Sequence, residues 1–304
     1  MKNKWYRPVL YILSTYILHP FLLLLPRVVV LQFANIFGIC AFYILRKERE
    51  KALSNLTYAF GDSYDDQSRL RLIKRLFVNL SMTACDFALF PKLTLKNINE
   101  LVNVDGFNRV DDIVNRRKQG LIVITAHLGN WELIASTFVR LGYKGLVLGK
   151  KIYYSGYNKI IVDLRESQGV YTFYRSSPPK EILRRLKAGE VLGVLPDQDI
   201  DDVEGIFIDF FGKPAYTPIG PAKMSLAAKV PIMLAFMVRQ GKRYNLIFDD
   251  IIEPVIYENE DKRSAIERIT RTWSNIVERY IRMYPDQWVW MHNRWKTKNN
   301  KVGV

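Results

Sequence analysis

The stretch "LIVITAHLGNWE" (Leu121–Glu132) joins an apolar run to a short polar segment and then to a helical pattern. Its first four residues are apolar throughout, which is typical of a strand covered on both faces of a sheet. Gly129 and Asn130 interrupt the run, and Asn is a preferred residue at the start of a helix. The stretch therefore predicts a buried strand, a turn and a helix that begins near Trp131.

Further short apolar runs occur along the chain, and helical patterns lie between several of them. The runs are 145–149, 191–195, 206–211, 232–238 and 244–249. Longer helical patterns cover 66–90 and 262–284, and Pro285 marks the end of the second. Strands that alternate with helices in this way predict an α/β fold, with a central, largely parallel or mixed sheet flanked by helices.

The N-terminal region is apolar and predicts a helical membrane anchor. Residues 8–26 and 28–45 contain no Lys, Arg, Asp or Glu, and each run approaches the ~20 residues that a membrane-spanning helix needs. Basic residues follow directly at Arg46, Lys47, Arg49 and Lys51, which favours the cytoplasmic side for the rest of the chain. We expect an anchor over 1–45 and one domain over 46–304. One span, a hairpin and an interfacial helix pair fit equally; a cleaved signal peptide or a pair of core helices fits less well.

The charge of the chain indicates an anionic partner. Against 30 Asp and Glu the chain has 45 Lys and Arg, a formal net charge of +15 and a pI of about 9.7. Nucleic acid, an anionic membrane surface and an acidic protein would each fit. No helix-turn-helix, zinc-finger or RNA-recognition signature is present, which disfavours nucleic acid. With only three histidines and two cysteines, Cys40 and Cys85, we expect no metal site and no disulfide framework.

His127 and Glu132 are candidates for acid–base chemistry. A strand over residues 121–126 would place His127 at its carboxyl end, where α/β sheets bind their ligands. From the first helical turn, Glu132 could hold one imidazole nitrogen and leave the other free to accept a proton. The alternative is a polar strand end followed by an acidic residue that stabilises the helix N-terminus. A non-catalytic membrane scaffold would be compatible with that alternative.

Several motifs together resemble one family. "HLGNWE" resembles the H-x4-D/E motif of lysophospholipid-type acyltransferases, in the form found in the lipid A biosynthesis (late, secondary) acyltransferase family. The similarity continues, in the family's order, through "NLTYAFG" (55–61), "VDGFNRV" (104–110), "RESQG" (165–169), "PDQD" (196–199), "GIFIDFFGKPAYTPIGPAK" (205–223) and "QWVWMHNRWK" (287–296). The last two stretches are far more specific than the histidine motif alone.

This resemblance implies an enzyme that moves a fatty acyl chain from acyl carrier protein to a hydroxyl of a lipid A precursor. The reaction would take place at the cytoplasmic face of a bacterial inner membrane, without a cofactor. Another glycolipid or a lysophospholipid, such as a phosphatidylinositol mannoside, is the alternative acceptor. Acyl carrier protein is acidic and the acceptor is a phosphorylated glycolipid, so basic residues would bind one or the other. The candidates are Arg184, Arg185 and Lys187, or the pair Lys150 and Lys151, and a solvated charged face is the alternative for each cluster.

Roles for individual residues follow from the same resemblance. His127 would be the general base and Glu132 would stabilise the imidazolium. Backbone groups near Gly129 and Asn130, or the side chain of Arg165, would bind the oxyanion, and a lipid phosphate is the alternative ligand for Arg165. Asp197 and Gln198 follow the apolar run that ends at Leu195, so they are either acceptor-binding residues or turn and cap residues.

Overall fold

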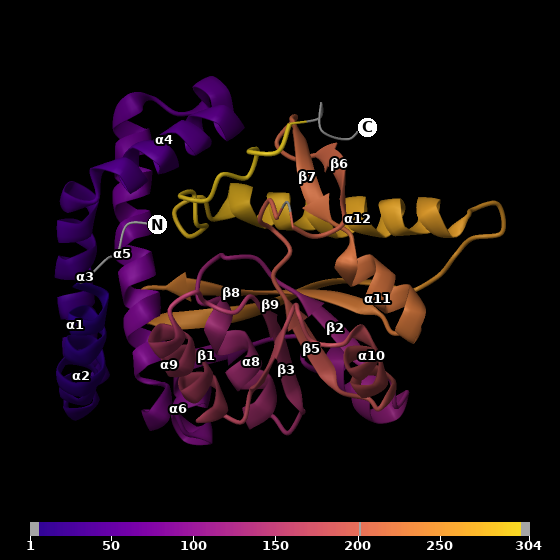
Figure 1. The fold of residues 1–304 in the computed structure, drawn as a ribbon, viewed down its shortest axis with the longest axis horizontal. Coiled ribbons are helices and arrows are strands. Elements are labelled where there is room, and N and C mark those ends of the chain that lie inside the picture. The colour runs from indigo at the N-terminus through magenta and orange to yellow at the C-terminus, as the bar shows by residue number, and fades with distance from the viewer. Residues whose placement is uncertain (1–5, 201, 299–304) are drawn as a thin grey trace.

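The computed structural model describes residues 6–200 and 202–298 and shows a seven-stranded sheet with helices on both faces (Figure 1). From one edge to the other, the strands are β1 (Val102–Val104), β9 (Arg243–Ile252), β8 (Ile232–Gln240), β2 (Leu121–Ile124), β5 (Val191–Val194), β3 (Gly145–Gly149) and β4 (Tyr171–Tyr174). β9 is antiparallel to β8, and every other neighbouring pair is parallel. The expected α/β fold with a mixed sheet is confirmed.

Alternate side chains of β2 point into two separate cores. Ile122 and Ile124 belong to the larger core, together with side chains of α5 (Asp66–Ala88), α10 (Pro179–Lys187), α11 (Gly220–Ala228) and α12 (Lys262–Met283). Leu121 and Val123 belong to the second core, with α6 (Leu95–Leu101), α7 (Asn108–Asp111) and α8 (Trp131–Arg140). Because side chains alternate across a strand, a run that is apolar at every position fills both cores.

The strand predictions hold with one difference of position. The runs at 121–126, 145–149, 191–195, 232–238 and 244–249 all form strands of the main sheet. The run at 206–211 instead forms β6 (Gly205–Asp209), which pairs with β7 (Pro214–Pro218) in a separate antiparallel hairpin. Short 3-10 helices lie at Gly61–Ser63 and Phe90–Lys92, and a short π-helix lies at Asp112–Arg116.

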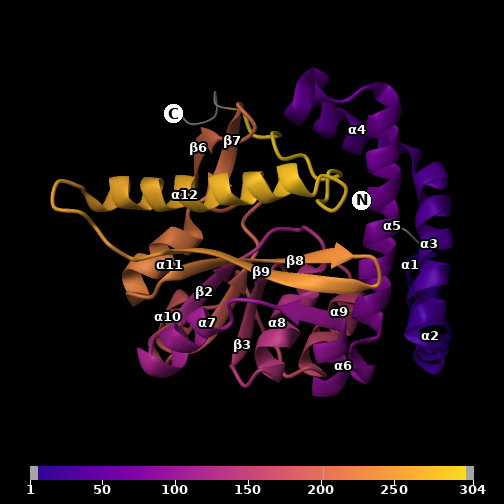
Figure 2. The same ribbon diagram turned by 180° about the vertical axis from the view of Figure 1, so that it is seen from behind.

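The N-terminal helices lie against the rest of the protein. The chain runs through α1 (Tyr6–Ile12), a π-helical turn (Leu13–Leu18) and α2 (His19–Leu24), and then returns through α3 (Arg27–Ile44) beside α5 (Figures 1 and 2). α3 packs closely on α5, because a Cβ at Gly38 would lie only 2.5 Å from Cα of Val78. The ring of Tyr11 contacts Tyr154 and Tyr157 at the start of α9 (Ser155–Glu166). α4 (Arg46–Phe60) then connects α3 to α5.

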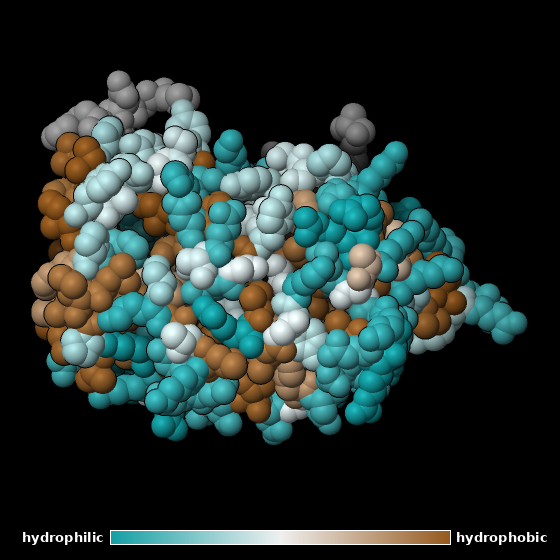
Figure 3. All heavy atoms as spheres, turned by 90° about the horizontal axis from the view of Figure 1, so that it is seen from below, coloured by the Kyte–Doolittle hydropathy of each residue, from teal (hydrophilic) through white to brown (hydrophobic). Residues whose placement is uncertain are grey.

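These helices expose many apolar side chains. α3 is long and apolar enough to cross a membrane by length and composition alone, with a mean hydropathy of 1.7. Exposed apolar side chains also lie on α1, the π-helical turn and α2, among them Ile12, Tyr16, Phe21 and Leu24. Figure 3 shows apolar side chains gathered at the left, on the side of the molecule formed by these helices. Residues 1–5 of the predicted anchor lie outside the described residues.

Candidate active site

The turn after β2 brings His127 to the carboxyl edge of the sheet. Gly129 has a φ of +63°, and a Cβ at this position would lie 2.0 Å from the carbonyl oxygen of Met237, so the turn requires glycine. Asn130 then begins α8, and its Oδ1 accepts a hydrogen bond from the backbone N–H of Leu133 at 3.3 Å. The expected strand, turn and helix are therefore present.

The imidazole of His127 is paired with Asp197. Nδ1 of His127 lies 2.8 Å from Oδ1 of Asp197, and the backbone N–H of His127 donates to Oδ2 at 2.9 Å. Nε1 of Trp288 donates to the same Oδ2 at 2.8 Å. Asp197 follows β5, which is the parallel neighbour of β2, so the two carboxyl ends meet at one edge. The Asp197 side chain is fully buried, whereas that of His127 is 25% exposed.

These contacts determine which imidazole nitrogen of His127 is free to accept a proton. Burial by itself raises the pKa of Asp197, but the charge of His127 and hydrogen bonds from His127 and Trp288 hold that pKa below its ordinary value. An ionised carboxylate only accepts hydrogen bonds, so the proton of a neutral His127 lies on Nδ1. Within the described residues, no group forms a hydrogen bond with Nε2. Nε2 can therefore accept a proton from a bound hydroxyl.

Glu132 differs from the expected arrangement, because its carboxylate is bound by Arg165 and not by the imidazole. Nε and Nη2 of Arg165 donate to its two oxygens at 2.8 and 2.7 Å. Burial opposes the charge of Arg165, but the bonds to Glu132 raise its pKa above the ordinary value. The position beside Nδ1, expected for Glu132, is occupied by Asp197 because the strand ends converge there, whereas α8 directs Glu132 towards α9. Catalytic roles for Glu132 and Arg165 stay predictions.

Asn130 and Gln198 have different surroundings. Asn130 is fully buried, and its Nδ2 donates to the hydroxyl of Tyr244 at 3.1 Å. The backbone N–H groups of Gly129 and Asn130 donate to the carbonyl oxygens of Gln287 and Met237, so both expected oxyanion donors are already bonded within the fold. Gln198 is half-buried beside Asp197. Substrate contacts of Asn130, Arg165, Asp197 and Gln198 stay predictions.

Sequence reasoning missed the part played by the segment after α12. The backbone N–H of Val289 donates to the carbonyl oxygen of His127 at 3.0 Å, next to the bond from Trp288 to Asp197. Nε2 of His292 accepts from the backbone N–H of Asp199 at 3.1 Å. The repeated Trp residues of "QWVWMHNRWK" carried a signal, because a buried indole N–H needs an acceptor.

An apolar cavity of about 350 Å³ begins beside the site. Leu195 and Pro196 line it directly before Asp197, and Ile182 of α10 and Met224 of α11 lie on its walls. A volume of this size lies within the range of small-ligand sites, which are mostly apolar. In residues 6–200 and 202–298, no three His, Cys, Asp or Glu side chains form a group that could hold a metal ion.

Comparison with known proteins identifies the family. A model of the bacterial lipid A biosynthesis acyltransferase family matches residues 2–297. The Escherichia coli lipid A biosynthesis lauroyltransferase is 26% identical over 91% of this chain and 89% of its own. The Haemophilus influenzae lipid A biosynthesis acyltransferase is 23% identical over 86% of this chain and 80% of its own. A phosphatidylinositol mannoside acyltransferase of Mycobacterium tuberculosis is 23% identical over 58% of this chain and 54% of its own. The chain thus belongs to the bacterial lipid A biosynthesis acyltransferase family and is an acyltransferase.

Proposed function

We propose that this acyltransferase moves a fatty acyl chain from the thioester of acyl carrier protein to a hydroxyl of a lipid A precursor. The observation that carries this proposal is the His127–Asp197 pair, whose Nε2 is available, in a chain of this family. The Escherichia coli and Haemophilus influenzae relatives, which match most of the chain, support a lipid A precursor as acceptor. The mycobacterial relative makes a phosphatidylinositol mannoside the second candidate.

In the proposed reaction, Nε2 of His127 removes the proton from the acceptor hydroxyl as its oxygen attacks the thioester carbonyl. Asp197 stabilises the imidazolium that forms. The tetrahedral intermediate then breaks its carbon–sulfur bond, and the leaving thiolate takes the proton from Nε2. The products are an ester and a free thiol on the carrier protein, and His127 returns to its starting state. No acyl-enzyme is required, because the thioester is already activated.

The oxyanion of the intermediate needs donors that the fold does not already use. The backbone N–H groups of Trp131 and Glu132 open α8, and they form no hydrogen bond to any acceptor in the described chain. A helix N-terminus favours negative charge, so these amides are our candidates. Arg165 is ion-paired with Glu132 at the start of α8, which offsets its charge, so it would contribute its remaining N–H group as a donor rather than a net positive charge.

The acyl donor is proposed to be an acidic carrier protein because the chain has a formal net charge of +15. The expected docking residues on α10 are less suited to this role. Arg184 and Arg185 both pair with Glu181, and Arg185 also pairs with Glu190. Their charges are largely offset locally, so we do not assign carrier-protein docking to this helix. The apolar cavity beside Asp197 would hold the acyl chain.

A direct assay tests the reaction. Purified protein is given a lipid A precursor with acyl carrier protein or coenzyme A thioesters of equal chain length and ionic strength, and products are identified by mass spectrometry. We expect transfer from the carrier protein, weakened by salt, and loss of transfer in His127→Ala. Wild-type turnover in His127→Ala would contradict the mechanism. Preference for the coenzyme A thioester would contradict the donor alone.

We also propose that residues 1–45 hold the protein at the cytoplasmic face of the inner membrane, with 46–304 as the catalytic domain. The exposed apolar side chains of α1 to α3 support this attachment. Apolar burial in a bilayer is insensitive to salt, so detergent but not high salt should release the protein from membranes. Release by salt alone would contradict the attachment.

A further inference from the structure

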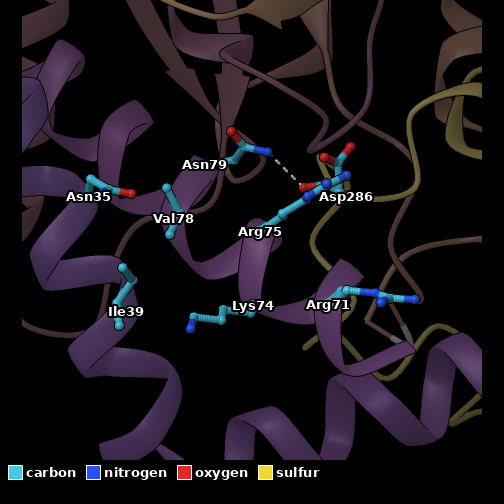
Figure 4. A pocket seen from close by; sticks show the side chains of 8 residues that line it. All are labelled: Asn35, Ile39, Arg71, Lys74, Arg75, Val78, Asn79 and Asp286. Atoms are coloured by element: carbon cyan, nitrogen blue, oxygen red, sulfur yellow. Dashed lines mark hydrogen bonds between the residues drawn. The ribbon is translucent and has the colours of Figure 1, made fainter. Parts of the chain in front are cut away.

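A cavity of about 390 Å³ opens between α3 and α5, and we call it the α3–α5 groove. Asn35 and Ile39 of α3 line one side, and Arg71, Lys74 and Arg75 of α5 line the other (Figure 4). Neither the His127–Asp197 pair nor the apolar cavity beside it shares a lining residue with this groove. It is therefore a second cavity with a different chemical character.

The three basic side chains of the groove form no close ion pairs with any described residue. Arg69, also on α5, pairs with Asp66 at 2.9 Å. By contrast, Arg71, Lys74 and Arg75 form no ion pair within 4.0 Å in the part of the chain that the structure describes. Arg71 donates to Oγ of Ser68, and the ammonium of Lys74 lies 5.5 Å from the centre of the Tyr43 ring.

One carboxylate, Asp286, lines the groove. Burial raises its pKa, and the charge of Arg75 opposes that rise. In Figure 4, Arg75 points towards Asp286, whereas Lys74 points towards α3. Three cations against one carboxylate leave the groove with a positive charge, which favours an anion over a cation.

The exposed apolar surface of α3 directly adjoins these cations. At 3.6 residues per turn, Asn35 and Ile39 lie about 40° apart on the face towards the groove, and Tyr43 follows on the next part of the helix surface. Ile36 and Phe37, on the neighbouring outer face, are 57% and 56% exposed. A ligand that fits both surfaces has an anionic group beside long apolar chains.

We propose that the α3–α5 groove binds the phosphate group of a membrane lipid, with Arg71, Lys74 and Arg75 supplying the positive charge and the acyl chains lying along the exposed face of α3. This inference rests on the proposed membrane attachment. The phosphate has two possible sources, an anionic phospholipid of the bilayer or the phosphorylated acceptor itself. Asp286 precedes Gln287, whose carbonyl oxygen accepts from Gly129, so the groove borders the segment that supports the catalytic turn.

Vesicle binding by the full chain tests the first source. The variant Arg71→Gln/Lys74→Gln/Arg75→Gln is compared with wild type on phosphatidylcholine vesicles with and without phosphatidylglycerol. Each basic residue near an anionic surface contributes about fivefold in affinity, so three together contribute about 100-fold. We expect the variant to lose the preference for phosphatidylglycerol and to keep its binding to phosphatidylcholine. The matched control Arg184→Gln/Arg185→Gln/Lys187→Gln removes the same formal charge from α10 and should keep most of the preference.

The second source is tested by kinetics with the same variants. If the groove binds the acceptor, the triple variant raises KM for the phosphorylated acceptor about 10-fold or more, and leaves KM for its dephosphorylated form and kcat unchanged. The proposal would be overturned if the triple variant of the groove kept both the preference for phosphatidylglycerol and the wild-type KM for the acceptor. It would also be overturned if the α10 control lost as much as the groove variant. If wild type binds vesicles with and without phosphatidylglycerol equally, and the triple variant leaves KM unchanged, the lipid-binding role of the groove is wrong and the membrane attachment still stands. Wild type that binds neither vesicle overturns the membrane attachment as well.

Discussion

Both oxygens of Asp197 are used to hold His127 in one orientation. Oδ1 contacts the imidazole Nδ1, and Oδ2 receives N–H groups from the His127 backbone and the Trp288 indole. Rotation of the carboxylate would break all three bonds, each of which involves a charged acceptor and contributes about 1.5–3 kcal/mol. The arrangement therefore fixes both the ring and its tautomer before substrate binds.

Replacement of Asp197 by Asn should lower kcat by about 10²–10⁴-fold, with a smaller change in KM. An amide NH₂ facing Nδ1 would favour the tautomer whose proton lies on Nε2, and that nitrogen could no longer accept the substrate proton. Glu132→Gln is the comparison, because it keeps the bond between Asp197 and His127 and loses only the charge beside Arg165. The measurement is kcat and KM for both variants against pH. If Glu132→Gln loses more kcat than Asp197→Asn, then Glu132 and not Asp197 orients His127.

His292 should make stability sensitive to acid. Burial lowers its pKa, and its Nε2 accepts a hydrogen bond, which requires the neutral ring. The pKa of His292 is lower in the folded protein than in the unfolded chain, where it is about 6.5. The neutral ring therefore stabilises the fold fully above about pH 6.5, and this stabilisation is lost as pH falls below that value. His292→Gln removes the titration. Between pH 7.5 and 5.5, the free energy of unfolding of wild type should fall more than that of the variant, by up to about 1 kcal/mol, in denaturant titrations. Equal changes in the two proteins would contradict this assignment.

The sequence predicted which candidate residues lie at strand ends better than it predicted which of them are in contact. His127 and Asp197 each follow an apolar run, so both were expected at strand ends. That β5 lies directly beside β2 could not be known, because strand order depends on long-range packing and not on local pattern. Glu132 was the nearest carboxylate in sequence, but the turn at Gly129 and the start of α8 direct it towards Arg165.

At the scale of helices and strands, a chain of buried polar contacts connects α3 to the start of α8. Arg27 donates to both oxygens of Asp86 on α5, at 2.7 and 3.0 Å. Asp86 also contacts Arg239 and the hydroxyl of Tyr244. That hydroxyl accepts from Asn130, the residue that caps α8. The position of the proposed anchor is thus coupled to the helix that follows the turn at His127.

Replacing Arg27 with Met should lower the free energy of unfolding by about 1–3 kcal/mol and increase hydrogen exchange in α3. The reason is that Asp86, whose side chain is 4% exposed, loses two charge-assisted bonds. Arg46→Met is the control, since the Arg46–Glu50 pair is largely exposed and its loss should cost about 0–0.5 kcal/mol. If both variants lose the same stability, the buried chain does not hold α3.

Helices with a strong periodicity of apolar residues could be predicted from sequence, whereas strands that depend on pairing with a distant strand could not. The pattern at 66–90 corresponds to α5, and the pattern at 262–284 corresponds to α12. β1 and β4 were not predicted, since they are edge strands of three and four residues and show no continuous apolar run. β7 begins and ends with proline, which disfavours a strand on sequence grounds, and it pairs with β6 in the hairpin.

For the molecule as a whole, the α3–α5 groove and the cavity beside Asp197 differ in chemical character. The groove between α3 and α5 is cationic and borders the apolar N-terminal helices, whereas the cavity beside Asp197 is mainly apolar. The proposed function needs both kinds of surface, because its acceptor would be fixed in a bilayer while its acyl chain must leave water. Composition predicts an anionic partner and an apolar anchor, and both stay predictions. The positions of the charged and apolar surfaces depend on how distant helices pack.

The cavity beside Asp197 should set the length of the acyl chain that is transferred. Met224 on α11 lines it, and Met224→Trp would fill space that the end of a long chain needs. Since one methylene that no longer fits changes selectivity by about 10–200-fold, kcat/KM for the longest accepted chain should fall at least about tenfold. Shorter chains should be transferred at nearly the wild-type rate. Met224→Leu conserves volume and is the control, and thermal unfolding checks that both variants fold. The measurement is competition between carrier-protein thioesters of graded length, with products resolved by mass spectrometry. An unchanged length preference in a folded Met224→Trp protein would mean that the acyl chain lies elsewhere, while the His127–Asp197 mechanism would still stand.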